Sequence, residues 1–151
     1  VDFQTSSTRF YIQRGKICGG PIWDLDLSTG NADFDYYREY NNATTTGDST
    51  EKFYCRGLWY KHFFKCPWFV EKVKARYIEL QPLGKNKMDI LLIKYRESFS
   101  KNFTKWPVNS KDVLFERIPF QTFEENYEYL RTWLIKRNEW LLKEWKISHL
   151  K

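Results

Sequence analysis

The residues with the clearest capacity for chemistry lie in one short segment, Gly20–Asn31. Asp24 and Asp26 are two positions apart there, so both carboxylates lie on the same side of an extended chain. Paired carboxylates, together with phosphate oxygens and water, suit a hard divalent cation such as Mg²⁺, and Asn31 would add a neutral oxygen. The alternative from spacing alone is that the two aspartates cap turns or pair with lysines, because Asp-x-Asp is common by chance.

Cysteine and histidine residues form a second candidate site. His62 and Cys66 are one helical turn apart, which is workable geometry for zinc, with Cys55 as a third ligand and Cys18 or a carboxylate as a fourth. The chain has no Cys-x-x-Cys motif, so a packed helix face is the favoured interpretation. Three cysteines also favour buried free thiols over a disulfide framework, with one bridge and one free thiol as the alternative.

A β-hairpin is expected just before the acidic segment. Residues 9–18 contain an aromatic and β-branched run, a turn at Arg14-Gly15 and a returning strand. Gly19-Gly20-Pro21 then ends the strand. Residues 28–52 are rich in turn formers and predict loops, with Asn41–Thr50 as a surface insert.

About four helices are expected from Gly57 onward, because apolar residues recur there at three and four positions. The first covers Leu58–Lys65, and Pro67 suits the first turn of the second. Pro82 and Gly84 are expected to end the second helix.

The last two helices have clear boundaries. Met88 opens the apolar pattern of the third, which stops before Pro107. Thr122 and Glu125 have the spacing of a capping box and predict the start of the fourth. Its apolar positions recur at helical spacing, at Tyr127, Leu130, Trp133, Leu134, Trp140, Leu141 and Trp145.

Composition indicates a folded protein of ordinary domain size. The chain has 151 residues, of which 42% are hydrophobic and 29% charged, and these values exclude wholesale disorder. No apolar run approaches the roughly 18 residues of a membrane helix, so no membrane span is expected. Aromatic residues reach 19%. Their helical spacing favours a core, and the alternative is platforms that stack sugars or nucleic-acid bases.

Charge is unevenly spread along the chain. Residues 1–56 carry six Lys/Arg and eight Asp/Glu, a net −2, whereas residues 57–151 carry nineteen and eleven, a net +8. Solvated helix faces explain this balance best, and an anionic partner for the basic part is the alternative. We expect no nucleic-acid partner.

The whole chain resembles the CotH family, the spore-coat-protein-H-like kinases. The most specific likeness is Gly-Pro-Ile-Trp-Asp-Leu-Asp-Leu-Ser-Thr-Gly-Asn-Ala-Asp at residues 20–33. Family members read approximately Gly-Pro-hydrophobic-Trp-Asp-aromatic-Asp/Asn there, followed by Gly-Asn. Further similar segments lie at Val1–Tyr11, Leu58–Phe69, Ser98–Pro107 and Arg131–Leu141.

The resemblance implies an α+β, mostly helical fold: the C-terminal lobe of an atypical protein-kinase-like domain. It implies phosphate transfer from ATP to Ser of a protein substrate, with Mg²⁺ or Mn²⁺ bound together with ATP in the complete protein. Asp2 takes the position of the catalytic-loop aspartate, and Asp24 that of the metal-binding aspartate. Asp26 is a second metal ligand, and Asn31 is assigned to the cofactor-binding residues.

Residues 1–151 are expected to form a single unit, with the catalytic and metal loops and the hairpin in 1–56 and the helices in 57–151. No Gly-rich phosphate loop or Val-Ala-Ile-Lys-like strand is found, so the nucleotide-binding part is expected to precede this chain in a longer protein. The chain alone is then expected to be inactive and to hold no cofactor tightly. The alternative is a catalytically dead surface or coat module that binds a protein partner. Either function is expected outside the cytoplasm, on a cell surface or spore coat.

Overall fold

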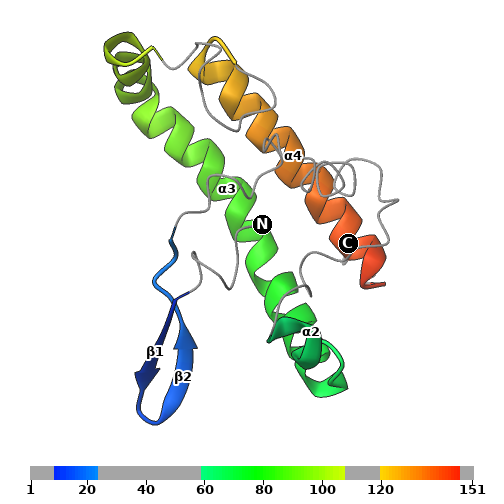
Figure 1. Ribbon diagram of the computed structural model, residues 1–151. Coiled ribbons are helices and arrows are strands. Elements are labelled where there is room, and N and C mark those ends of the chain that lie inside the picture. Colours follow the sequence, from blue (N-terminus) through cyan, green and yellow to red (C-terminus); the bar gives the residue numbers. More distant parts are fainter. Residues whose placement is uncertain (1–8, 24–58, 108–119, 147–151) are drawn as a thin grey trace.

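The computed structural model describes residues 9–23, 59–107 and 120–146. Its first two elements are the strands β1 (Phe10–Gln13) and β2 (Lys16–Gly19). They are followed by the helices α2 (Tyr60–Phe63), α3 (Pro67–Lys105) and α4 (Phe123–Glu144). Figure 1 shows α3 and α4 side by side as two long rods, with the hairpin set apart from them. The predicted architecture, mostly helical with a short N-terminal hairpin, is confirmed at this level.

The hairpin forms where the sequence predicts it. β1 and β2 pair antiparallel, with Tyr11 opposite Cys18 and Ile12 opposite Ile17. The connecting residues Arg14 and Gly15 both have positive φ, 50° and 72°, as in the two-residue turns that match the twist of paired strands. Local chemistry is therefore sufficient to place this element.

The corner between α2 and α3 is built from aromatic rings. Pro67 occupies the first turn of α3, as predicted, and Cys66 is its extended cap residue. The ring of Phe69 stacks on Phe63 at 5.2 Å and meets Phe64 edge-on at 5.4 Å. These contacts orient the short helix against the long one, and we call Phe63, Phe64 and Phe69 the aromatic corner.

The predicted break in the middle of the helical region is wrong. α3 runs through Pro82 and Gly84 without ending, so the second and third predicted helices are one element of 39 residues. Three helices, rather than about four, are present in the described ranges. The physical reason is that α4 packs along both halves of α3, and packing energy exceeds the local cost of the proline. The predicted stop before Pro107 is confirmed, because α3 ends at Lys105.

Gly84 offers a direct test of how much of this local cost can be removed. A Cβ built at Gly84 meets nothing within 4 Å, and the residue is exposed. Gly84→Ala is therefore expected to raise the free energy of unfolding by about 0.5–1 kcal/mol, the usual advantage of Ala over Gly inside a helix. Urea unfolding followed by circular dichroism measures the change. A decrease in stability would contradict the open surroundings of this position.

The start of α4 confirms the predicted capping box. The Glu125 backbone N–H donates to the Thr122 hydroxyl at 3.2 Å, and the Thr122 backbone N–H donates to the Glu125 carboxylate at 3.0 Å. These two bonds satisfy backbone donors that the first helical turn leaves without partners. The helix boundary is thus fixed by two side chains three residues apart.

The most buried apolar side chains of the described residues all lie in α4 or at its end: Trp133, Leu141, Leu142 and Trp145. Leu134, which the helical spacing also places among the apolar positions, is instead 36% exposed, and Phe99 of α3 is 39% exposed. The expectation of an aromatic core is confirmed for Trp133 and Trp145. Phe99 shows that helical spacing alone does not ensure burial, because its ring stacks on Phe123 at 4.4 Å and the residue is still partly exposed. In the ranges the structure describes, no helix combines the length and apolarity needed to cross a membrane.

Candidate functional site

The residues predicted to carry chemistry, Asp2, Asp24, Asp26 and Asn31, lie outside the described residues. The description ends just before the acidic pair, at Trp23, whose side chain is 56% exposed. The Gly20 backbone N–H donates to the Arg9 carbonyl at 2.8 Å, which extends the hairpin pairing by one step beyond β2. The hairpin that leads into the acidic segment is therefore in place.

The described residues do not assemble the candidate zinc site. Cys66 Sγ donates to the backbone carbonyl of His62 at 3.7 Å, a contact within one helical turn. Cys55 lies outside the described residues. Among the residues that are described, no three His, Cys, Asp or Glu side chains gather in a group suited to a metal ion. Cys18 and Cys66 are free thiols, as predicted, but each is half-buried rather than buried.

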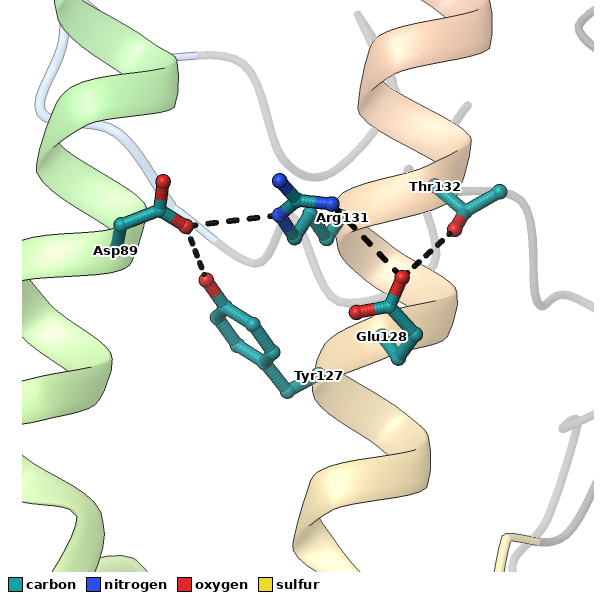
Figure 2. Close-up of polar contacts among 5 residues, drawn as sticks. All are labelled: Asp89, Tyr127, Glu128, Arg131 and Thr132. Atoms are coloured by element: carbon teal, nitrogen blue, oxygen red, sulfur yellow. Dashed lines mark hydrogen bonds and ion pairs between the residues drawn. The ribbon is translucent and has the colours of Figure 1, made fainter.

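The structure instead brings together a polar cluster between α3 and α4 (Figure 2). Asp89 on α3 accepts a hydrogen bond from the Tyr127 hydroxyl at 2.7 Å and faces Arg131 Nε at 3.5 Å through the same oxygen. Arg131 also lies 3.8 Å from Glu128, which accepts from the Thr132 hydroxyl at 3.4 Å. One carboxylate of α3 thus holds two side chains that are one turn apart on α4.

Two further contacts lie on either side of this cluster along the helices. The Tyr77 hydroxyl donates to the Asn138 side-chain oxygen at 2.8 Å. Arg96 Nε donates to Glu124 at 3.4 Å. Partner numbers fall along α4 as they rise along α3, so the two helices are antiparallel. We call these three sets of contacts, centred on Tyr77, Asp89 and Arg96, the interhelical polar row.

The environment of the row perturbs two tyrosines. Burial raises the pKa of Tyr127, and the hydrogen bond from its hydroxyl to Asp89 and the charge of that carboxylate raise it further. Burial also raises the pKa of Tyr77, while the positive charge of Arg137 opposes the shift. Arg137 itself lies over the Trp140 ring at 4.5 Å, so it is a stacked cation within α4. Both tyrosines are held in their neutral, hydrogen-bonding form.

These contacts position the helices and leave little capacity for catalysis. The Asp89 oxygen that accepts the hydrogen bond from Tyr127 also faces the Arg131 guanidinium, so these contacts already occupy the oxygen that a general base would need. Sequence patterns alone did not single out this site. The available signal was Asp89 next to Met88 in an otherwise apolar stretch, together with Tyr127 and Arg131 four residues apart. Polar residues so placed need a partner when helices pack.

The raised tyrosine pKa values predict a loss of stability in alkali. In the unfolded chain a tyrosine loses its proton near its ordinary pKa of 10.0, whereas the folded protein holds that proton to higher pH. Unfolding therefore releases protons, and the free energy of unfolding falls as the pH rises above about 10. Urea titrations between about pH 9 and 11 measure this slope. Replacing both Tyr77 and Tyr127 with Phe is expected to reduce the slope of the free energy of unfolding against pH. An unchanged slope would refute the conclusion that these two tyrosines cause the loss of stability in alkali.

Comparison with known proteins gives no family for this chain. No protein-family model matches the sequence, and neither the curated proteins nor the solved structures include a significant match.

Proposed function

We propose that this chain is the C-terminal portion of a CotH-like protein kinase, which transfers phosphate from ATP to Ser of a protein substrate. The observation that carries the proposal is the Gly20–Asn31 segment, with its Gly-Pro-Ile-Trp-Asp start and its Gly-Asn end. A β-hairpin leading into this segment and a mostly helical remainder are compatible with a kinase-like C-terminal lobe. The nucleotide-binding part is proposed to precede residue 1 in the complete protein.

The donor set of the segment fits a magnesium ion bound together with nucleotide phosphates. Asp24 and Asp26 supply carboxylate oxygens and Asn31 an amide oxygen, which are the hard ligands that Mg²⁺ prefers. When bound, the ion neutralises charge on the phosphate oxygens. Asp2 orients the Ser hydroxyl of the substrate and accepts its proton. Each of these roles is assigned by resemblance.

The deciding experiment measures phosphate transfer by the full-length protein. Purified protein is incubated with labelled ATP and Mg²⁺ or Mn²⁺, and label on protein is counted. Labelling that is absent after Asp24→Asn and after Asp2→Asn supports both the kinase activity and the two roles. Labelling that persists in both variants moves the chemistry to other residues. A folded protein that neither labels nor binds nucleotide refutes the kinase proposal.

A second candidate is a kinase-like module without catalytic activity that binds a protein partner on a cell surface or spore coat. The favouring observation is the number of large apolar side chains left exposed on the described elements, including Trp59, Trp68, Ile90 and Ile93. Ile90 and Ile93 are three positions apart on one face of α3 and are 60% and 81% exposed, and exposed apolar side chains that lie together are typical of interaction sites. This candidate predicts that binding of labelled protein to intact cells or spores survives Asp24→Asn and removal of metal with EDTA. The kinase proposal instead predicts that, without nucleotide, the protein binds to cells or spores more weakly than this second candidate requires.

A further inference from the structure

One end of the molecule presents large aromatic side chains to solvent. Trp59 is the N-cap residue of α2, and Trp68 lies in the first turn of α3. Their side chains are 58% and 60% exposed, and Phe63 at the end of α2 is exposed as well. Figure 1 shows α2 at the start of α3, so these three residues lie at one end of the long helix.

Ring contacts hold these exposed residues in one cluster. The Trp68 ring meets Phe69 edge-on at 5.8 Å, and Phe69 stacks on Phe63 at 5.2 Å. The Phe63 backbone N–H donates to the Trp59 carbonyl at 3.2 Å, which ties Trp59 to the same short helix. The rings stay exposed in spite of these contacts. Exposed apolar side chains gathered in this way are typical of binding surfaces.

The same cluster carries positive charge. Between the two tryptophans the sequence contains Lys61 and Lys65, both exposed, and no Asp or Glu. Lys72, in the next turn of α3, is also exposed and lies over the Trp68 ring at 5.8 Å. The first carboxylate that follows, Glu71, already faces the lysine three positions later at 3.3 Å. We call the exposed rings and these lysines the aromatic tip: Trp59, Lys61, Phe63, Lys65, Trp68 and Lys72.

An anionic lipid surface matches this combination of rings and charge. Tryptophan suits the boundary between lipid headgroups and acyl chains because its ring is amphipathic. Lysines beside it are attracted to negatively charged headgroups. Single-stranded nucleic acid also binds to rings beside lysines, but its bases need open ring faces. Phe63 already stacks on Phe69. Lys72 likewise lies over Trp68, so one face of each of these exposed rings is occupied. A lipid surface takes up exposed ring area in any orientation, and the contacts therefore favour it.

We propose that the aromatic tip docks this protein onto anionic membrane surfaces. The rings of Trp59, Phe63 and Trp68 enter the headgroup boundary, and the three lysines of the tip face the lipid phosphates. The contact is peripheral, as for amphipathic segments that lie on a membrane. It requires neither proposed function, because the ligand is lipid and not a nucleotide or a protein. Binding to protein-free vesicles without nucleotide therefore tests it separately from both.

Sedimentation of the purified full chain with sucrose-loaded vesicles measures this binding. Vesicles made of equal parts of phosphatidylcholine and phosphatidylglycerol are expected to bind the protein, and vesicles of phosphatidylcholine alone to bind it at least about tenfold more weakly. Lys61→Gln together with Lys65→Gln is expected to weaken binding to the anionic vesicles about thirtyfold, because each lysine near such a surface contributes about fivefold. Trp59→Ala together with Trp68→Ala is expected to weaken it by about tenfold or more, because two rings no longer enter the headgroup boundary.

Matched variants separate the aromatic tip from general charge and general hydrophobicity. Trp106→Ala removes a tryptophan that is 56% exposed and has a lysine over its ring, but at the other end of α3, and it should leave vesicle binding unchanged. Lys87→Gln together with Lys94→Gln removes the same charge from exposed positions in the middle of α3 and should weaken binding far less than the Lys61 and Lys65 pair. If circular dichroism shows that the double tryptophan variant is unfolded, Trp59→Ala alone is measured in its place.

Four outcomes overturn the proposal. They are no binding to anionic vesicles, equal binding to both kinds of vesicle, equal losses from the tip variants and their matched controls, and preferential binding of labelled oligothymidylate that competes with the vesicles and is lost in the tryptophan variants. The last outcome would assign the aromatic tip to single-stranded nucleic acid.

Discussion

Under the kinase proposal, replacing Asp24 with Asn is expected to reduce phosphate transfer by the full-length protein by about a thousandfold. The amide keeps the shape of the side chain but removes the negative charge that is proposed to hold a divalent cation on the nucleotide phosphates. A metal ion contributes several kcal/mol of charge stabilisation in such reactions, and each 1.4 kcal/mol is about tenfold in rate. Initial rates of label incorporation at several Mg²⁺ concentrations measure the effect.

The control for this variant is Asp48→Asn, the same change in the Asn41–Thr50 segment, where no chemical role is proposed. It is expected to keep the wild-type rate. Asp2→Asn should reduce the rate by about 10²–10⁴-fold, the usual contribution of a positioned general base, without changing the Mg²⁺ dependence. If the Asp24 and Asp48 variants lose the same share of the phosphate-transfer rate, the rate depends on acidic charge in general and not on a metal site at Asp24.

Trp133→Ala is expected to cause the largest loss of stability among substitutions in the described core. The Trp133 side chain is 6% exposed in the middle of α4. Truncation removes its transfer free energy and leaves a cavity, which together cost about 3–5 kcal/mol for a buried Trp. Since small proteins are stable by only about 5–15 kcal/mol, this is a large fraction of the total. Urea unfolding followed by circular dichroism measures the shift in midpoint.

The matched control is the next residue in the chain. Leu134 is 36% exposed, so Leu134→Ala removes less buried area and is expected to cost about 1 kcal/mol or less. The sequence pattern places both residues among the apolar positions of this helix, and only their burial separates them. Similar losses for the two variants would contradict the orientation of α4.

Local elements were predictable because their causes are local. The hairpin turn at Arg14-Gly15 depends on two adjacent residues, and its register follows from turn length. The capping box joins Thr122 to Glu125 within one turn. Pro67 and Pro107 mark the ends of α3 because proline suits a first turn and disfavours the residue before it as helix.

Elements that depend on distant parts of the chain were missed or left untested. The contacts of Asp89 join it to residues 38 and 42 positions later, as the pairs with Tyr127 and Arg131 show, and no local pattern contains that information. Asp24, Asp26 and Asn31 were singled out by residue type and spacing and Asp2 by resemblance, and all four lie outside the described residues.

The sequence by itself determined the hairpin turn at Arg14-Gly15, the starts of α3 at Pro67 and of α4 after Thr122, and that the described chain is mostly helical with an N-terminal hairpin. Only the tertiary structure decided that α3 continues through Pro82, which of its apolar neighbours are buried, and that Asp89 and Tyr77 face α4. The physical reason is that a proline or a glycine inside a helix destabilises it locally by about 3 kcal/mol at most. Packing against a second helix contributes stabilising free energy that depends on the residues of both helices. A helix break predicted from local residues therefore does not occur where a distant helix packs against the chain both before and after the predicted break.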